Sequence, residues 1–113
     1  MARKLINVPT EIEIVAGGNE THCLNLTGFL LDGQSVTAAS VSEVAGTELL
    51  TISGATHLTS TFTSRTTGST VASGKGASVN IAAGSTAGSG YIEWSVTLTD
   101  GDDPKFRQKF CVL

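Results

Sequence analysis

The chain has 113 residues, a formal net charge of −3, 40% hydrophobic residues and 5% aromatic residues. This length suits one domain with one core. The mild acidity and the few aromatic residues argue against nucleic-acid binding, and no apolar run is long enough to span a membrane. Thirteen glycines, abundant Ser and Thr, and few Lys and Glu favour strands and turns over helices. The composition therefore predicts an all-β fold.

The first residues, "MARKLINVPTEIEIV", are basic but lack the apolar core and cleavage site of a signal peptide. We therefore expect a protein that is not exported by that route. Residues 1–9 are predicted to form an N-terminal arm, and residues 10–113 a single domain.

Alternation of apolar and polar residues marks successive strands along the domain. "SVTAASVSEV" and "TELLTIS" indicate two of them, while Asp32-Gly33 indicates a turn and residues 65–78 a flexible loop. The side chains expected to face the core are Ile12, Ile14, Leu24, Leu26, Val79, Ile81, Ile92, Trp94, Val96, Leu98, Phe106, Phe110 and Val112. Seven or eight short strands with regularly spaced turns predict an immunoglobulin-like antiparallel β-sandwich.

The segment "TLTDGDDPKF" places Asp100, Asp102 and Asp103 around Gly101. Carboxylates at such spacing can bind calcium, but a helix–loop–helix site would also need a late bidentate Glu, and here Pro104 and a strand follow. Asp and Gly favour turns, and Pro lacks an amide donor. We therefore predict a turn and no metal.

The remaining reactive side chains form no recognisable catalytic or cofactor motif. His22 and His57 are the only histidines, and no nucleophile–base–acid pattern accompanies them. Gly74-Lys75-Gly76 lacks the flanking pattern of a phosphate loop. Cys23 and Cys111 lack the further ligands of a zinc site, and two free thiols are favoured over a disulfide in an unexported chain. We expect no enzyme activity and no cofactor.

Three of the seven basic residues, Lys105, Arg107 and Lys109, alternate along the last predicted strand. One interpretation is that they protect an edge strand from unwanted pairing. The other is that the first strand lies beside the last, so that Glu11 and Glu13 form cross-strand pairs with Arg107 and Lys109.

Two longer segments, "LDGQSVTAASVSEVAGTELLTIS" and "VNIAAGSTAGSGYIEWSVTLTDGDDPKFRQKFCVL", have a pattern of turns and strands that resembles a group of small bacteriophage virion proteins. These proteins are described as fibre–tail adaptor or minor structural proteins. The resemblance covers about residues 30–113 and involves only strand and turn residues, so it transfers no active-site residue. The matching residues are Gly33, Ser35, Val36, Leu49, Leu50, Ile52, Gly84, Ala87, Gly88, Tyr91, Asp100, Gly101, Arg107, Phe110 and Val112.

The resemblance implies a virion structural protein, assembled in the host cytoplasm, that binds the major capsid protein or tail and portal components and can form homo-oligomers. A single compact domain without a fibre repeat favours a capsid decoration (cement) protein over a fibre–tail adaptor or another tail component. The residues expected to contact partners are Arg3, Lys4, Leu5, Lys105, Arg107 and Lys109.

A carbohydrate-binding β-sandwich is the alternative from another class. Sugar sites stack the ligand on exposed aromatic side chains. Tyr91 is the one aromatic residue predicted to face outward on its strand, whereas Trp94 is predicted to be buried.

Overall fold

A computed structural model describes residues 5–44, 48–64 and 68–113 of the chain, and all regular structure in these residues is β. This confirms the predicted all-β class. The strands, in chain order, are β1 (Leu5–Ile14), β2 (Asn19–Asn25), β3 (Val36–Glu43), β4 (Leu50–His57), β5 (Phe62–Thr63), β6 (Thr70–Val71), β7 (Gly76–Ala83), β8 (Gly88–Leu98) and β9 (Lys105–Val112).

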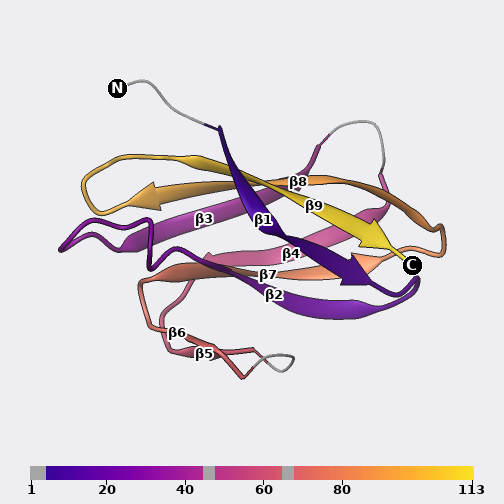
Figure 1. Cartoon of the computed structure of the whole chain (residues 1–113), viewed down its shortest axis with the longest axis horizontal. Coiled ribbons are helices and arrows are strands. Elements are labelled where there is room, and N and C mark those ends of the chain that lie inside the picture. Colours follow the sequence, from indigo (N-terminus) through magenta and orange to yellow (C-terminus); the bar gives the residue numbers. More distant parts are fainter. Residues whose placement is uncertain (1–4, 45–47, 65–67) are drawn as a thin grey trace.

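Seven of these strands form a β-sandwich of two sheets (Figure 1). One sheet has the order β1-β9-β8-β3 and the other β2-β7-β4. Neighbouring strands are antiparallel except β1 and β9, which are parallel. The three-stranded sheet and the β9-β8-β3 part of the other sheet follow the immunoglobulin arrangement, with the first strand added beside the last. The short hairpin β5–β6 lies outside the two sheets, at the bottom of Figure 1.

The core lies between the two sheets and consists mostly of aliphatic side chains. All the side chains predicted to face the core are less than a tenth exposed, and Trp94 and Phe110 are fully buried. The period-two alternation of a strand explains this agreement, because one face of each strand must pack against the opposite sheet.

One polar side chain, Gln108, is also buried, on the same side of β9 as Phe106 and Phe110. Its Oε1 accepts a hydrogen bond from Trp94 Nε1 at 3.1 Å, and its Nε2 donates to the Thr10 carbonyl at 2.8 Å. Thr10 lies where the register of β1 against β9 shifts, between Val8 and Ile12. Gln108 therefore satisfies a backbone acceptor freed by this irregularity, in keeping with the rule that buried polar groups are paired.

The aspartate segment forms the predicted turn between β8 and β9. Gly101 has a φ of +92°, a conformation that favours glycine. Asp100 Oδ1 accepts a hydrogen bond from the Asp102 amide at 3.1 Å, and its Oδ2 accepts one from Gln34 Nε2 at 2.6 Å. These two bonds, the backbone bond first, hold the pKa of Asp100 below its ordinary value.

Several boundaries differ from the sequence prediction. Residues 5–9, assigned above to the arm, form the first half of β1 and lie beside β9, whereas residues 1–4 lie outside the described residues. The stretch 65–78 overlaps β6 and the start of β7, and residues 65–67 are not described. Strand β9 is not an edge, because β1 covers one side and β8 the other, so its basic residues cannot act as edge protection.

The two cysteines are free. Cys23 lies on β2 and Cys111 on β9, in different sheets. Their strand neighbours Leu24 and Phe110 point into the core, so both thiols face outward from opposite sides of the sandwich. Partial burial raises the pKa of Cys23 to about 11.

Candidate functional site

The outer surface of the four-stranded sheet carries a ladder of charged and polar side chains, which we call the charged face. It forms because the inward positions of these strands are taken by the core, and the alternate positions must point to solvent. Its members are Leu5, Asn7, Glu11 and Glu13 on β1, Lys105, Arg107 and Lys109 on β9, Tyr91, Glu93, Ser95 and Thr97 on β8, and Ala38, Ser40 and Ser42 on β3.

The described members of the predicted contact set lie together on this face. Leu5 is opposite Lys105 in the register of β1 against β9, and Arg107 and Lys109 continue the same row on β9. The expected Arg3 and Lys4 contacts lie outside the described residues. The structure thus places a row of three cations in the middle of the sheet.

The predicted contact between the first and last strands is confirmed, but only one of its charge pairs forms. Lys109 Nζ lies 3.8 Å from Glu11 Oε2, and both side chains are well exposed. Such a pair contributes only about a few tenths of a kcal/mol. The prediction for Glu13 was wrong, because the register sets it opposite Cys111, and Arg107 lies opposite the neutral Asn7.

The three cations differ in whether their charged groups have a hydrogen-bond or ion-pair partner. Lys105 donates a hydrogen bond to Ser95 Oγ at 2.9 Å, and Lys109 has Glu11 nearby. Arg107 is half-buried, and its Nε is covered and has no hydrogen-bond partner among the described residues. Glu93 lies directly opposite Arg107 on β8, yet no ion pair joins them among the described residues. The alternation of residues in the sequence predicted the correct face for Arg107, but it gave no sign that the Nε would lack a hydrogen-bond partner.

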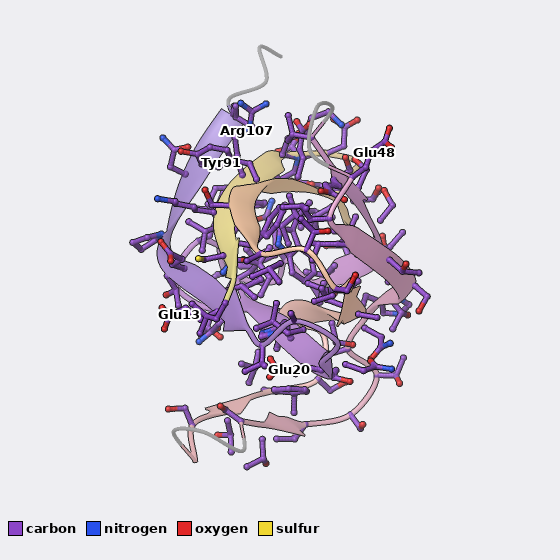
Figure 2. The ribbon with its side chains drawn as sticks, turned by 90° about the vertical axis from the view of Figure 1, so that its right-hand side faces the viewer. Glu13, Glu20, Glu48, Tyr91 and Arg107 are labelled. Atoms are coloured by element: carbon purple, nitrogen blue, oxygen red, sulfur yellow. The ribbon has the colours of Figure 1, made fainter. Side chains whose placement is uncertain are left out.

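Tyr91 stands beside this row. It is 45% exposed, while Trp94 is fully buried, which confirms the predicted orientation of both rings. Tyr91 pairs with Lys109, and Arg107 is two residues along the same strand from Lys109. In Figure 2, Tyr91 and Arg107 lie on the same side of the molecule, and Glu20 of β2 lies far from them. Tyr and Arg, with Trp, are the residue types enriched among the side chains that dominate binding energy at protein interfaces.

A hollow of about 200 Å³ opens next to the cation row, over β3 and β8. It is lined mostly by small side chains, among them Ala38, Ser40 and Ser95, and also by Asp103 and Lys105. The charged face therefore combines a ridge of large side chains with a depression that a partner side chain can enter.

The opposite outer face, on β2, β7 and β4, is chemically different. Its outward side chains are all small or amide-bearing and none is charged: Asn19, Thr21, Cys23, Asn25, Ser78, Asn80, Ala82, Thr51, Ser53 and Thr56. The charged side chains of the sandwich strands are thus concentrated on one of the two faces.

The two histidines do not come together. His22 is on β2 and His57 on β4, and β7 runs between these strands. His22 Nε2 lies 2.9 Å from Glu20 Oε1, within ion-pair range but without hydrogen-bond alignment. No group of three or more His, Cys, Asp or Glu side chains that could hold a metal ion occurs in the part of the chain that the structure describes.

Fold and face together define an immunoglobulin-like β-sandwich that presents one charged sheet surface. Among residues 5–44, 48–64 and 68–113, no helix is long and apolar enough to cross a membrane. Neither the known family models nor the curated proteins searched include a match to this chain.

Proposed function

We propose that this protein is a non-enzymatic structural protein of a bacteriophage virion, which binds other virion proteins through the charged face. The resemblance of residues 30–113 to small virion proteins supports the class. The observation that carries the proposal is the exposed Tyr91 beside the incompletely paired Arg107, on the two central strands of a rigid sheet.

The position of these residues suits a binding role. β8 and β9 each have a strand on both sides, so the backbone under Tyr91 and Arg107 is held by hydrogen bonds in both directions. A backbone that is already ordered loses little conformational freedom on association. An aromatic and an arginine at the centre, with polar residues around them, is the arrangement of a protein interface.

The size of the face favours assembly in many copies. Strands of eight residues at about 3.3 Å each, four abreast at about 4.8 Å, give a flat area of about 500 Å². A stable interface covers about 800 Å² on each partner. The accessible surface of a face with side chains exceeds its flat area, so one copy provides at most about one interface of standard size, and contacts with neighbouring copies on a shell would strengthen attachment. This reasoning favours a capsid decoration (cement) protein over a fibre–tail adaptor or another tail component.

The test is binding of the purified protein to particles. Empty shells and isolated tails of the encoding phage would be incubated separately with the protein and pelleted. We expect many copies on each shell, and loss of binding in the double variant Tyr91→Ala/Arg107→Glu. Thr51→Ala, on the uncharged outer face, is the matched control. Binding to tails alone would establish the adaptor function, and binding to neither would refute the proposal.

A carbohydrate-binding function is the second candidate, because the exposed ring of Tyr91 could stack against a sugar. A glycan array separates the two functions. Glycan binding that disappears in Tyr91→Ala, together with no binding of the wild type to shells or tails, would favour the carbohydrate function over the structural one.

A further inference from the structure

We infer that the charged face receives an acidic protein segment and that Arg107 is the residue that binds its carboxylate. This inference rests on the proposed function and names the chemistry of the partner. It is based on two observations. The three basic side chains of β9 differ in whether they have a bonding partner, and the strand register determines which residues lie opposite Arg107.

Arg107 has a binding capacity that the fold leaves unused. A guanidinium carries five N–H donors in a planar fork that matches the two oxygens of a carboxylate. No ion pair or hydrogen bond to Arg107 occurs among the described residues, and its Nε is shielded from solvent. A covered donor without a partner is unfavourable. A carboxylate from outside would bind the other N–H donors of the guanidinium with charge-assisted bonds.

The neighbours of Arg107 make it the most attractive point for an anion. On the β1 side it faces Asn7, which is neutral, and on the β8 side it faces Glu93, with which it forms no ion pair among the described residues. Lys109, in contrast, has Glu11 at 3.8 Å. Lys105 already donates to Ser95. Of the three cations, Arg107 is therefore the one without an ion pair or a side-chain hydrogen bond among the described residues.

The spacing of the row indicates an extended segment. Alternate residues of a strand lie about 6.6 Å apart, so Lys105, Arg107 and Lys109 present cations at that interval on β9. A partner chain in β conformation repeats its side chains at the same interval. Acidic residues at every second position would then meet the row in register, with the central one on Arg107.

A second copy of this chain does not fit as the occupant. Aligned stacking of two such faces, with one β9 above the other, sets one cation row against the other, and like charges repel. The partner is therefore a different protein whose contact segment is acidic.

Glu93 allows a test in which two variants should change the binding affinity in opposite directions. It lies directly opposite Arg107 on β8 and competes with any incoming carboxylate for the guanidinium, while also repelling it. Replacing Glu93 by Gln removes both effects. Arg107→Gln should therefore weaken binding of an acidic segment, and Glu93→Gln should strengthen it.

The probe is a synthetic peptide of alternating Glu and Thr, about eleven residues long so that it spans β9 when extended. Its binding to the full chain would be followed by NMR titration at low salt, because exposed charge pairs are screened as salt rises. We expect amide shifts on β8 and β9, and none with the matched Gln–Thr peptide. Arg107→Gln should lower the affinity about tenfold, Arg107→Lys less, and Glu93→Gln should raise it. Lys75→Gln is the control, because Lys75 bonds the Gln34 carbonyl, outside the charged face.

The outcomes decide between the inference and the proposed function. Equal affinity of wild type and Arg107→Gln for the peptide, with both folded by thermal unfolding, would overturn the inference. Tighter binding of a single-stranded DNA oligonucleotide than of the Glu–Thr peptide would also overturn it, because the face would then be a general polyanion site. Arg107-dependent peptide binding without any shell or tail binding would leave the inference standing and refute the proposed function.

Discussion

Replacement of Gln108 by Met should destabilise the fold although the side chain keeps nearly the same size. Gln108 accepts from Trp94 Nε1 and donates to the Thr10 carbonyl. Met fills the space but makes neither bond. The indole N–H of a fully buried ring then has no acceptor, while the Thr10 carbonyl, from an exposed residue, can still find water.

The size of the effect follows from these two bonds. The buried indole N–H without an acceptor lowers the free energy of unfolding by about 1–3 kcal/mol, and the lost hydrogen bond to Thr10 lowers it by about 0.5–1.5 kcal/mol. Burying a thioether in place of an amide offsets about 1 kcal/mol of this. The net loss is therefore about 2 kcal/mol, and for a domain of this length it should lower the Tm by about 8 °C.

The assay is urea unfolding followed by far-UV circular dichroism, because Trp94 is the only tryptophan of the chain and the double-mutant cycle includes Trp94→Phe. The Phe ring has no N–H, so Gln108→Met should cost about 1 kcal/mol less in the Trp94→Phe background than in the wild type. If Gln108→Met unfolds at the same urea concentration as the wild type, or if its cost is unchanged by Trp94→Phe, the bridging role of Gln108 is wrong.

Three further predictions concern the N-terminal residues 1–4, the turn that contains Asp100, and the thiol of Cys23. Deletion of residues 1–4 leaves β1 in place and should reduce particle binding if this segment contacts the shell; unchanged pelleting with shells would remove it from the contact set. The lowered pKa of Asp100 means that its contribution to stability is present above its unfolded pKa and is lost as pH falls through the lower folded pKa. Wild type should therefore lose more thermal stability than Asp100→Asn between about pH 5 and pH 2, and parallel losses would contradict this. With its pKa at about 11, Cys23 should react with a disulfide reagent at pH 8 more slowly than a thiol in a short peptide, as measured by mass spectrometry after a timed quench.

The alternation of apolar residues was enough to predict the class, the core and the face of the cation row. Trp94 and Phe110 are buried and Tyr91 is exposed, because a strand with period two has only two ways to place its side chains. Local patterns also identified the Gly101 turn, since glycine there adopts a positive φ.

Strand neighbours and irregularities could not be predicted in the same way. The extra residues of β1 between Val8 and Ile12 leave no periodic signal. Alternation put Gln108 on the inward side with Phe106 and Phe110, but it could not show that the Thr10 carbonyl would be its partner. Long-range pairing likewise decided that Arg107 faces Asn7 and Glu93. Sequence alone gives the face of a residue in a strand but not its cross-strand partner.

The buried bridge at Gln108 and the anion-binding role of Arg107 depend on one another through the register of β9. These residues are adjacent, so they necessarily point to opposite faces. A slip of β9 by one position would bury the Arg107 guanidinium among apolar side chains and expose Phe106 and Phe110, at a cost that far exceeds any surface interaction. The burial of Phe106 and Phe110 thus fixes the register, and Gln108 holds β9 locally against the Trp94 indole and the irregular part of β1. A variant that weakens the bridge should therefore impair binding at Arg107 before the whole domain unfolds.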